Sequence, residues 1–164
     1  SRHGVVRARQ IAVCGPAECT RAEWSTARSV GALLAAARAV VLCGGGSGVM
    51  AAAAAGARAA GGLVIGIRPG GDPDDADPSL SAVVATGMGE ARNVVLVRSA
   101  DAVIVIGGSW GTLSELALAR RSGIPVVSML SWSVVDADGH PLLDPVPRAT
   151  SPEDAVRRAL NPPR

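Results

Sequence analysis

Short apolar runs alternate with longer segments rich in alanine and leucine along this chain. Continuous apolar runs bounded by turn residues are typical of strands that are buried on both faces of a sheet. The longer segments have the length and composition of helices that pack on such a sheet. The predicted strands are 10–14, 40–43, 63–67, 82–86, 101–106 and 125–129. The predicted helices are 22–39, 49–60, 90–99, 113–122 and a last helix capped by Ser151.

Alternating strands and helices predict the α/β class. We expect three layers around a mostly parallel, doubly wound sheet of about six to seven strands. One domain is expected over 10–164, preceded by a flexible N-terminal arm over 1–9, with a hairpin-like excursion at 136–143. Ligands of such folds bind beyond the carboxyl ends of the strands, so the loops that follow strands two, four and five matter most.

Composition narrows the classes of function. Hydrophobic residues make up 48% of the chain, enough for a buried sheet. The net charge is +2 and the basic residues are scattered, whereas a nucleic-acid groove normally needs a concentrated basic face. All 16 residues counted as lysine or arginine are arginine. The absence of lysine excludes a lysine Schiff base and a phosphate loop of the G-x-x-x-x-G-K-[ST] type.

Cysteine, histidine and aspartate give little support for a metal site. The three cysteines have no C-x-x-C spacing, which indicates reduced thiols, and no apolar stretch is long enough to span a membrane. We therefore expect a cytoplasmic protein. His3 and His140 are isolated, and the aspartate-rich loop 72–77 is more typical of a solvated loop than of a hard-metal site.

Two glycine-rich loops, 44–48 and 107–112, each join a predicted strand to a predicted helix. Glycines let backbone N–H groups approach an anion, and the start of the helix adds a favourable dipole. Both loops are therefore candidate phosphate sites, although a tight turn without a ligand would also explain the first. The candidate ligand-binding residues are Gly45, Gly46, Ser47, Gly107, Gly108, Ser109, Gly111 and Thr112.

Arg92 and Glu115 are the candidate catalytic residues. Arg92 lies in the first turn of a predicted helix, where a cation is disfavoured unless a bound anion offsets it. Glu115 ends the sequence Thr112-Leu113-Ser114-Glu115, which matches a capping box, so its role can be purely structural. A carboxylate beside a phosphate loop can equally serve glycosidic hydrolysis. Trp110 can stack on a base, pack at a subunit contact or anchor its loop.

Three motifs, at 44–50, 87–93 and 107–115, resemble those of the Lonely Guy (LOG)-like superfamily, in the same order. The resemblance implies a modified Rossmann fold, a nucleotide-binding domain and a homodimer or homotetramer. By position, Arg92 and Glu115 match the functional arginine and glutamate of that superfamily. The sequence Ala91-Arg92-Asn93 is closest to the uncharacterised bacterial branch that resembles molybdenum cofactor carrier proteins.

The resemblance implies two functions. The first is a phosphoribohydrolase, which hydrolyses the N-glycosidic bond of a nucleoside 5′-monophosphate to the base and ribose 5-phosphate, without a required cofactor. The second is a non-catalytic carrier or sensor of a nucleotide or molybdopterin-type cofactor. Both imply a small phosphorylated ligand as the partner, with neither nucleic acid nor membrane. The absence of lysine conflicts with the lysine decarboxylase name that this superfamily often carries.

Overall fold

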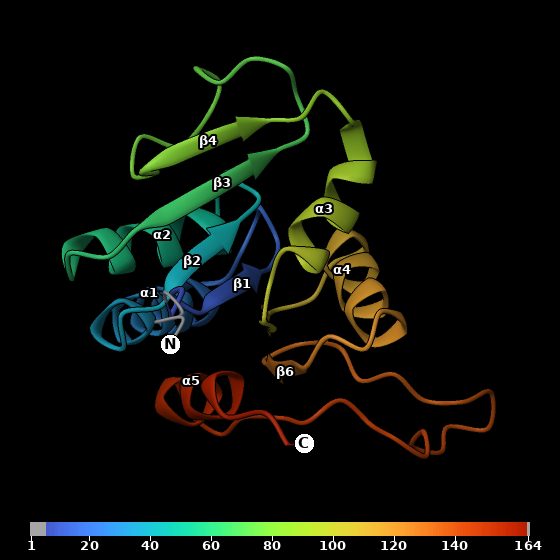
Figure 1. Ribbon diagram of the computed structural model, residues 1–164. Coiled ribbons are helices and arrows are strands. Elements are labelled where there is room, and N and C mark those ends of the chain that lie inside the picture. Colours follow the sequence, from blue (N-terminus) through green and yellow to red (C-terminus); the bar gives the residue numbers. More distant parts are fainter. Residues whose placement is uncertain (1–5, 164) are drawn as a thin grey trace, which may run out of the picture.

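The computed structural model describes residues 6–163 (Figure 1). Within them, six strands form one sheet in the order β4-β3-β2-β1-β5-β6, and every neighbouring pair is parallel. This confirms the predicted α/β class and parallel sheet. The strands are β1 (Gln10–Cys14), β2 (Val40–Cys43), β3 (Val64–Arg68), β4 (Ala82–Ala85), β5 (Ala102–Ile106) and β6 (Val126–Met129).

Helices cover both faces of the sheet and complete the three layers (Figure 1). One face carries α1 (Arg21–Ala36), α2 (Val49–Ala59) and α5 (Pro152–Leu160). The other face carries α3 (Arg92–Arg98), preceded by the short 3-10 helix η1 (Gly89–Ala91), and α4 (Trp110–Arg121). Each layer buries its own side of the strands, which explains why β5 is buried along its whole length.

The helices α1 and α2 touch through two glycines. A Cβ atom at Gly31 would lie 2.0 Å from the carbonyl oxygen of Ala53, and one at Gly56 would lie 2.0 Å from that of Arg28. Neither position can hold a side chain without moving a helix, since real Cβ contacts are far longer. This close approach fixes α2, and with it the loop that precedes α2.

Two helix boundaries differ from their predictions. The helix predicted over 22–39 ends at Ala36, because Arg38 takes a left-handed conformation with φ 60° and turns the chain towards β2. The helix predicted over 113–122 begins at Trp110, because the side chain of Ser109 accepts a hydrogen bond from the backbone N–H of Thr112.

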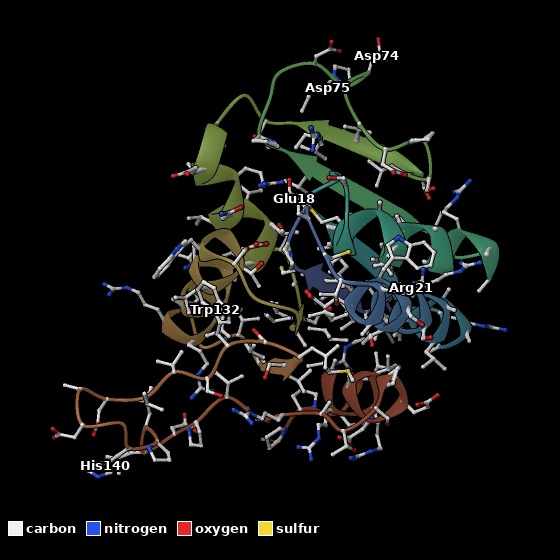
Figure 2. The ribbon with its side chains drawn as sticks, turned by 180° about the vertical axis from the view of Figure 1, so that it is seen from behind. Glu18, Arg21, Asp74, Asp75, Trp132 and His140 are labelled. Carbon is white, nitrogen blue, oxygen red and sulfur yellow. The ribbon has the colours of Figure 1, made fainter. Side chains whose placement is uncertain are left out.

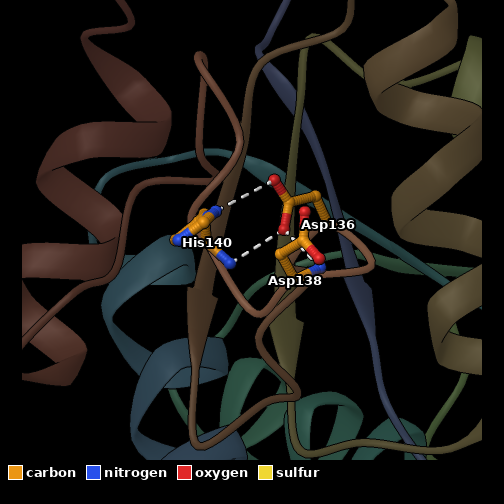
Figure 3. Close-up of side chains that lie close together, drawn as sticks. All are labelled: Asp136, Asp138 and His140. Carbon is orange, nitrogen blue, oxygen red and sulfur yellow. Dashed lines mark hydrogen bonds and ion pairs between the residues drawn. The ribbon is translucent and has the colours of Figure 1, made fainter.

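The segment 131–148 leaves the compact part of the fold and returns to β6 (Figure 1). An antiparallel bridge between Val135 and Pro141 confirms the hairpin-like excursion. Asp136, Asp138 and His140 lie together at its exposed turn (Figure 3). One carboxylate oxygen of Asp136 accepts the backbone N–H groups of the other two residues, so this cluster closes the turn.

The N-terminal arm predicted over 1–9 lies partly outside the described residues. Arg9 accepts the backbone N–H of Val40 at 2.8 Å through its carbonyl oxygen, and the guanidinium of Arg7 donates two hydrogen bonds to Asp101, at 2.7 and 2.8 Å. The hydrogen bond from Arg7 lowers the pKa of Asp101 to about 2, and the backbone N–H of Gln10 contributes to the same shift. No helix among residues 6–163 has the length and apolar character required to cross a membrane.

Candidate functional site

The candidate site lies at the carboxyl edge of the sheet, where the strand order reverses. In the sheet, β2, β3 and β4 lie on one side of β1, whereas β5 and β6 lie on its other side. The loops after β1 and β5 therefore diverge at this point. The loop after β2 lies against the loop after β1. A Cβ atom at Gly48 would lie 2.3 Å from the carbonyl oxygens of Pro16 and Ala17, and Gly48 has a positive φ of 68°.

The loop after β2 presents the uncapped start of α2. Within residues 6–163, no side chain caps the start of α2, whose capping residue is Gly48, but the N–H of Val49 donates to the carbonyl oxygen of Pro16 at 3.1 Å. The hydroxyl of Ser47 donates to the carbonyl oxygen of Ala17 at 3.3 Å, so it points to the β1 loop. The next two N–H groups, those of Met50 and Ala51, and the helix dipole favour a bound anion here.

Arg92 is fixed beside this loop by backbone carbonyl groups. Its Nη1 donates to the oxygens of Gly44, at 3.0 Å, and Ile67, at 2.7 Å, while Nε donates to the side chain of Asn93 at 3.0 Å. Burial lowers the pKa of the Arg92 guanidinium, although the group stays charged at neutral pH. A half-buried cation held by neutral carbonyls is well suited to meet an anion.

The loop after β5 is arranged differently from the sequence prediction. Because α4 begins at Trp110, Thr112 and Glu115 do not form a capping box, and that interpretation is wrong. Ser109 caps the helix, and its hydroxyl donates to that of Thr112 at 2.9 Å. Thr112 is only 2% exposed, so its hydroxyl is engaged within the loop. The backbone N–H groups of Trp110 and Gly111 are the donors that remain at this helix start.

Two side chains from elsewhere in the fold lie against the β5 loop. A Cβ atom at Gly107 would lie 1.9 Å from a carboxylate oxygen of Glu23, and one at Gly108 would lie 2.3 Å from the ring of Trp132. The ring of Trp132 also meets that of Trp110 edge to face, with centroids 5.2 Å apart. A side chain at either glycine would displace one of these two side chains, and Gly107 also has a positive φ of 78°.

Glu115 lies on the inner side of α4, near Arg92 and the thiol of Cys14. Burial raises the pKa of the Glu115 carboxyl, and both the hydrogen bond from Cys14 and the charge of Arg92 counteract that rise. Burial also raises the pKa of the Cys14 thiol well above its ordinary value, and the carboxylate of Glu115 raises it further. Cys14 therefore stays a neutral thiol beside the carboxylate.

The structure brings the predicted residues to one edge in two groups. Gly45, Gly46 and Ser47 lie at the start of α2 with Arg92, and the 107–112 loop lies at the start of α4, the helix that carries Glu115. Three further residues at this edge were not predicted as site residues: Glu23, Arg68 and Trp132.

Sequence signals for these three residues are uneven. The spacing Thr20-x-x-Glu23 is a capping box, which the structure contains at the start of α1. Arg68 ends β3, at the ligand edge of the sheet, where a cation is unusual in an apolar run. No local pattern indicates Trp132, because it comes to Gly108 only through the pairing of β5 with β6, which places the segment after β6 beside the loop after β5.

Comparison with known proteins gives the family. The family model described as SLOG cluster4 matches residues 8–156. The chain belongs to the SLOG cluster4 family. An uncharacterized protein of Archaeoglobus fulgidus is 42% identical over 127 residues, which cover 77% of this chain and 83% of that protein. The resemblance to the LOG-like superfamily, seen in the three glycine-rich motifs, is thereby confirmed.

Solved structures agree with this assignment. The molybdenum cofactor binding protein of Rippkaea orientalis superposes with a TM-score of 0.82 at 33% identity, covering 93% of this chain and 96% of that one. The molybdenum cofactor carrier protein of Chlamydomonas reinhardtii gives 0.78 at 27% identity, covering 94% and 99%. DNA processing protein A of Streptococcus pneumoniae shares the fold, with a TM-score of 0.71 at 20% identity. That superposition covers 93% of this chain and 62% of the other.

Proposed function

We propose that this protein binds the phosphate of a nucleotide- or pterin-type ligand at the carboxyl edge of the sheet and carries the ligand without changing it. The observation that carries the proposal is Arg92, whose guanidinium is fixed by the carbonyl groups of Gly44 and Ile67 beside the uncapped start of α2. A cation and free N–H groups in one place match a phosphate group.

Relatives support a cofactor as the cargo. The proteins of Rippkaea orientalis and Chlamydomonas reinhardtii, which superpose over nearly the whole chain, are described as binding or carrying molybdenum cofactor. Such a cofactor combines a pterin with a phosphate group. The phosphate would bind near Arg92, and the start of α4 offers further N–H donors for the remaining polar groups.

Hydrolysis of a nucleoside 5′-monophosphate is the second candidate function. Its support is Glu115, which lies near Arg92 and whose raised pKa suits a group that exchanges a proton during glycosidic cleavage. The carboxylate would orient the attacking water or hold the ribose hydroxyls, and Arg92 would balance the charge of the phosphate. No metal ion is needed for these roles.

One pair of measurements separates the two functions. Protein purified under mild conditions is denatured, and the released small molecules are identified by mass spectrometry. Protein freed of ligand is then incubated with a panel of nucleoside 5′-monophosphates, and free base is measured by chromatography. A co-purified pterin without base release supports the carrier, whereas base release that Glu115→Gln abolishes supports the hydrolase and contradicts the carrier.

Arg92→Gln tests the phosphate site in either case. The substitution removes the cation but can keep one hydrogen bond, and we expect phosphate-ligand affinity to fall about 10- to 100-fold. Arg98→Gln is the matched control, since Arg98 is an exposed arginine at the other end of α3. Equal affinities of the two variants would contradict a phosphate site at Arg92.

A further inference from the structure

Two guanidinium groups converge on one carbonyl oxygen at the carboxyl edge. Nη1 of Arg92 donates to the oxygen of Gly44 at 3.0 Å, and Nη1 of Arg68, from the end of β3, donates to the same oxygen at 3.3 Å. Arg68 also lies against the glycine loop, because a Cβ atom added at Gly45 would be 2.7 Å from the Cδ of Arg68. Two like charges are thus held close together over residues 44–46.

Negative charge near this pair is weak. Among residues 6–163, no carboxylate lies within 4.0 Å of Arg92, and Asp75 alone reaches Arg68, at 3.9 Å. The side chain of Asp75 is 85% exposed, whereas that of Arg68 is only 19% exposed. An exposed ion pair of this length contributes little to Arg68. Burial lowers the pKa of the Arg92 guanidinium, whereas the carboxylate of Glu115 raises it from a longer distance, so the charge of the pair is only partly compensated. An anion bound between them would offset their repulsion.

Hydrogen-bond donors also remain free. Within the described residues, Nη2 of Arg92 makes no hydrogen bond, and Nη2 of Arg68 has only the long contact to Asp75. The two guanidinium groups lie beside residues 44–46, the segment that leads into the start of α2. This donor set suits a terminal phosphate, which has three acceptor oxygens, better than a phosphodiester, which has two.

Asp75 belongs to the loop 69–81, which bends over the glycine loop. The backbone N–H of Asp77 donates to the carbonyl oxygen of Gly45 at 3.3 Å, and this contact holds the two loops together. Figure 2 shows Asp74 and Asp75 at the outer end of that loop, on the rim of the molecule. The exposed carboxylate of Asp75 lies within 3.9 Å of the largely buried guanidinium of Arg68.

We propose that Arg68 and Arg92 together bind the dianionic phosphate monoester of the ligand over residues 44–46, and that Asp75 competes with this phosphate for Arg68. The proposal rests on the proposed function and defines its ligand more closely. The ligand must end in a phosphate monoester, because a diester has one negative charge fewer and no third oxygen. Loss of the Asp75 charge should strengthen binding, whereas loss of the Arg68 charge should weaken it.

Ribose 5-phosphate and its methyl phosphate ester are the probes, titrated into the full chain at pH 8 and followed by NMR. The wild-type protein should bind the monoester about tenfold more tightly than the methyl ester. Arg68→Gln should lose most of this preference, and Arg68→Lys should keep part of it because the charge remains. Asp75→Asn should bind the monoester severalfold more tightly. Arg98→Gln should match the wild type.

An unchanged preference in Arg68→Gln, or weaker monoester binding by Asp75→Asn, would overturn the proposal. Equal loss of affinity for both probes in Arg68→Gln would also overturn it, since that pattern indicates a general effect of charge or folding. The proposed function fails separately, if neither probe binds to the wild type and the purified protein releases no phosphorylated ligand.

Discussion

Gly56→Ala tests the contact between α1 and α2 that positions the first glycine loop. The added Cβ would lie 2.0 Å from the carbonyl oxygen of Arg28 and 2.8 Å from its carbonyl carbon, both backbone atoms that cannot turn aside. One helix must therefore move away from the other. Overpacking of this kind costs about 3 kcal/mol at the upper end of its usual range.

Alanine also favours the helix over glycine by about 1 kcal/mol, so the expected net loss is about 2 kcal/mol in the free energy of unfolding. For a chain of this length, that corresponds to a fall in Tm of roughly 4–8 °C. Thermal unfolding followed by circular dichroism, together with urea titration, measures both quantities.

Gly111→Ala is the matched control, because Gly111 is also helical but a Cβ there would lie 3.9 Å from its nearest neighbour, the Oγ of Ser109. Without a ligand, this variant should be as stable as the wild type or more stable, by up to about 1 kcal/mol. If Gly56→Ala were as stable as Gly111→Ala, the backbone contact between the two helices would not exist as described.

Three further perturbations test the site and its support. Gly107→Ala should lose about 3 kcal/mol in the free energy of unfolding measured in urea, because φ is +78° and the new Cβ would meet Glu23 at 1.9 Å. Gly123→Ala is the control, since φ is +72° and no neighbour lies within 4 Å, so it should show the cost of backbone strain alone, about 1 kcal/mol. Equal losses in the two variants would refute the clash with Glu23. Burial raises the pKa of Glu115, so the folded state favours its protonated form and loses stability as the pH rises through that pKa. Glu115→Gln should accordingly have a higher Tm than the wild type at pH 7 and the same Tm near pH 4, and a lower Tm at pH 7 would contradict this reasoning. The hydrogen bonds from Arg7 hold the pKa of Asp101 at about 2. The charged carboxylate therefore stabilises the fold at every pH above the ordinary aspartate pKa, and this contribution disappears as the pH falls towards 2. Asp101→Asn should cost about 1 kcal/mol at pH 7 and nothing near pH 2, as measured by urea titration at each pH, and a cost independent of pH would show that the ion pair is not its source.

The strands were predictable because strands that are buried on both faces consist of continuous apolar runs. β1 and β2 have the predicted bounds, β3 is shifted by one residue at both ends, and β4, β5 and β6 differ by one residue at one end. The glycine loops were also predictable, since glycine before a helix has a direct backbone consequence. The start of α4 was not, because Ser109 and Thr112 are both good capping residues and only the packing against β5 and Trp132 selects the first.

The sequence by itself determined the fold class, the edge of the sheet that carries the loops, and Arg92 and Glu115 as the charged candidates. These depend on residue type and local spacing, which the chain displays directly. Tertiary structure alone decided which side chains share a neighbour. Arg68 and Arg92 are far apart in sequence, yet both donate to the oxygen of Gly44, since the order of the strands places the end of β3 beside the loop after β2. Charge convergence of this kind depends on distance in space, which no local pattern encodes.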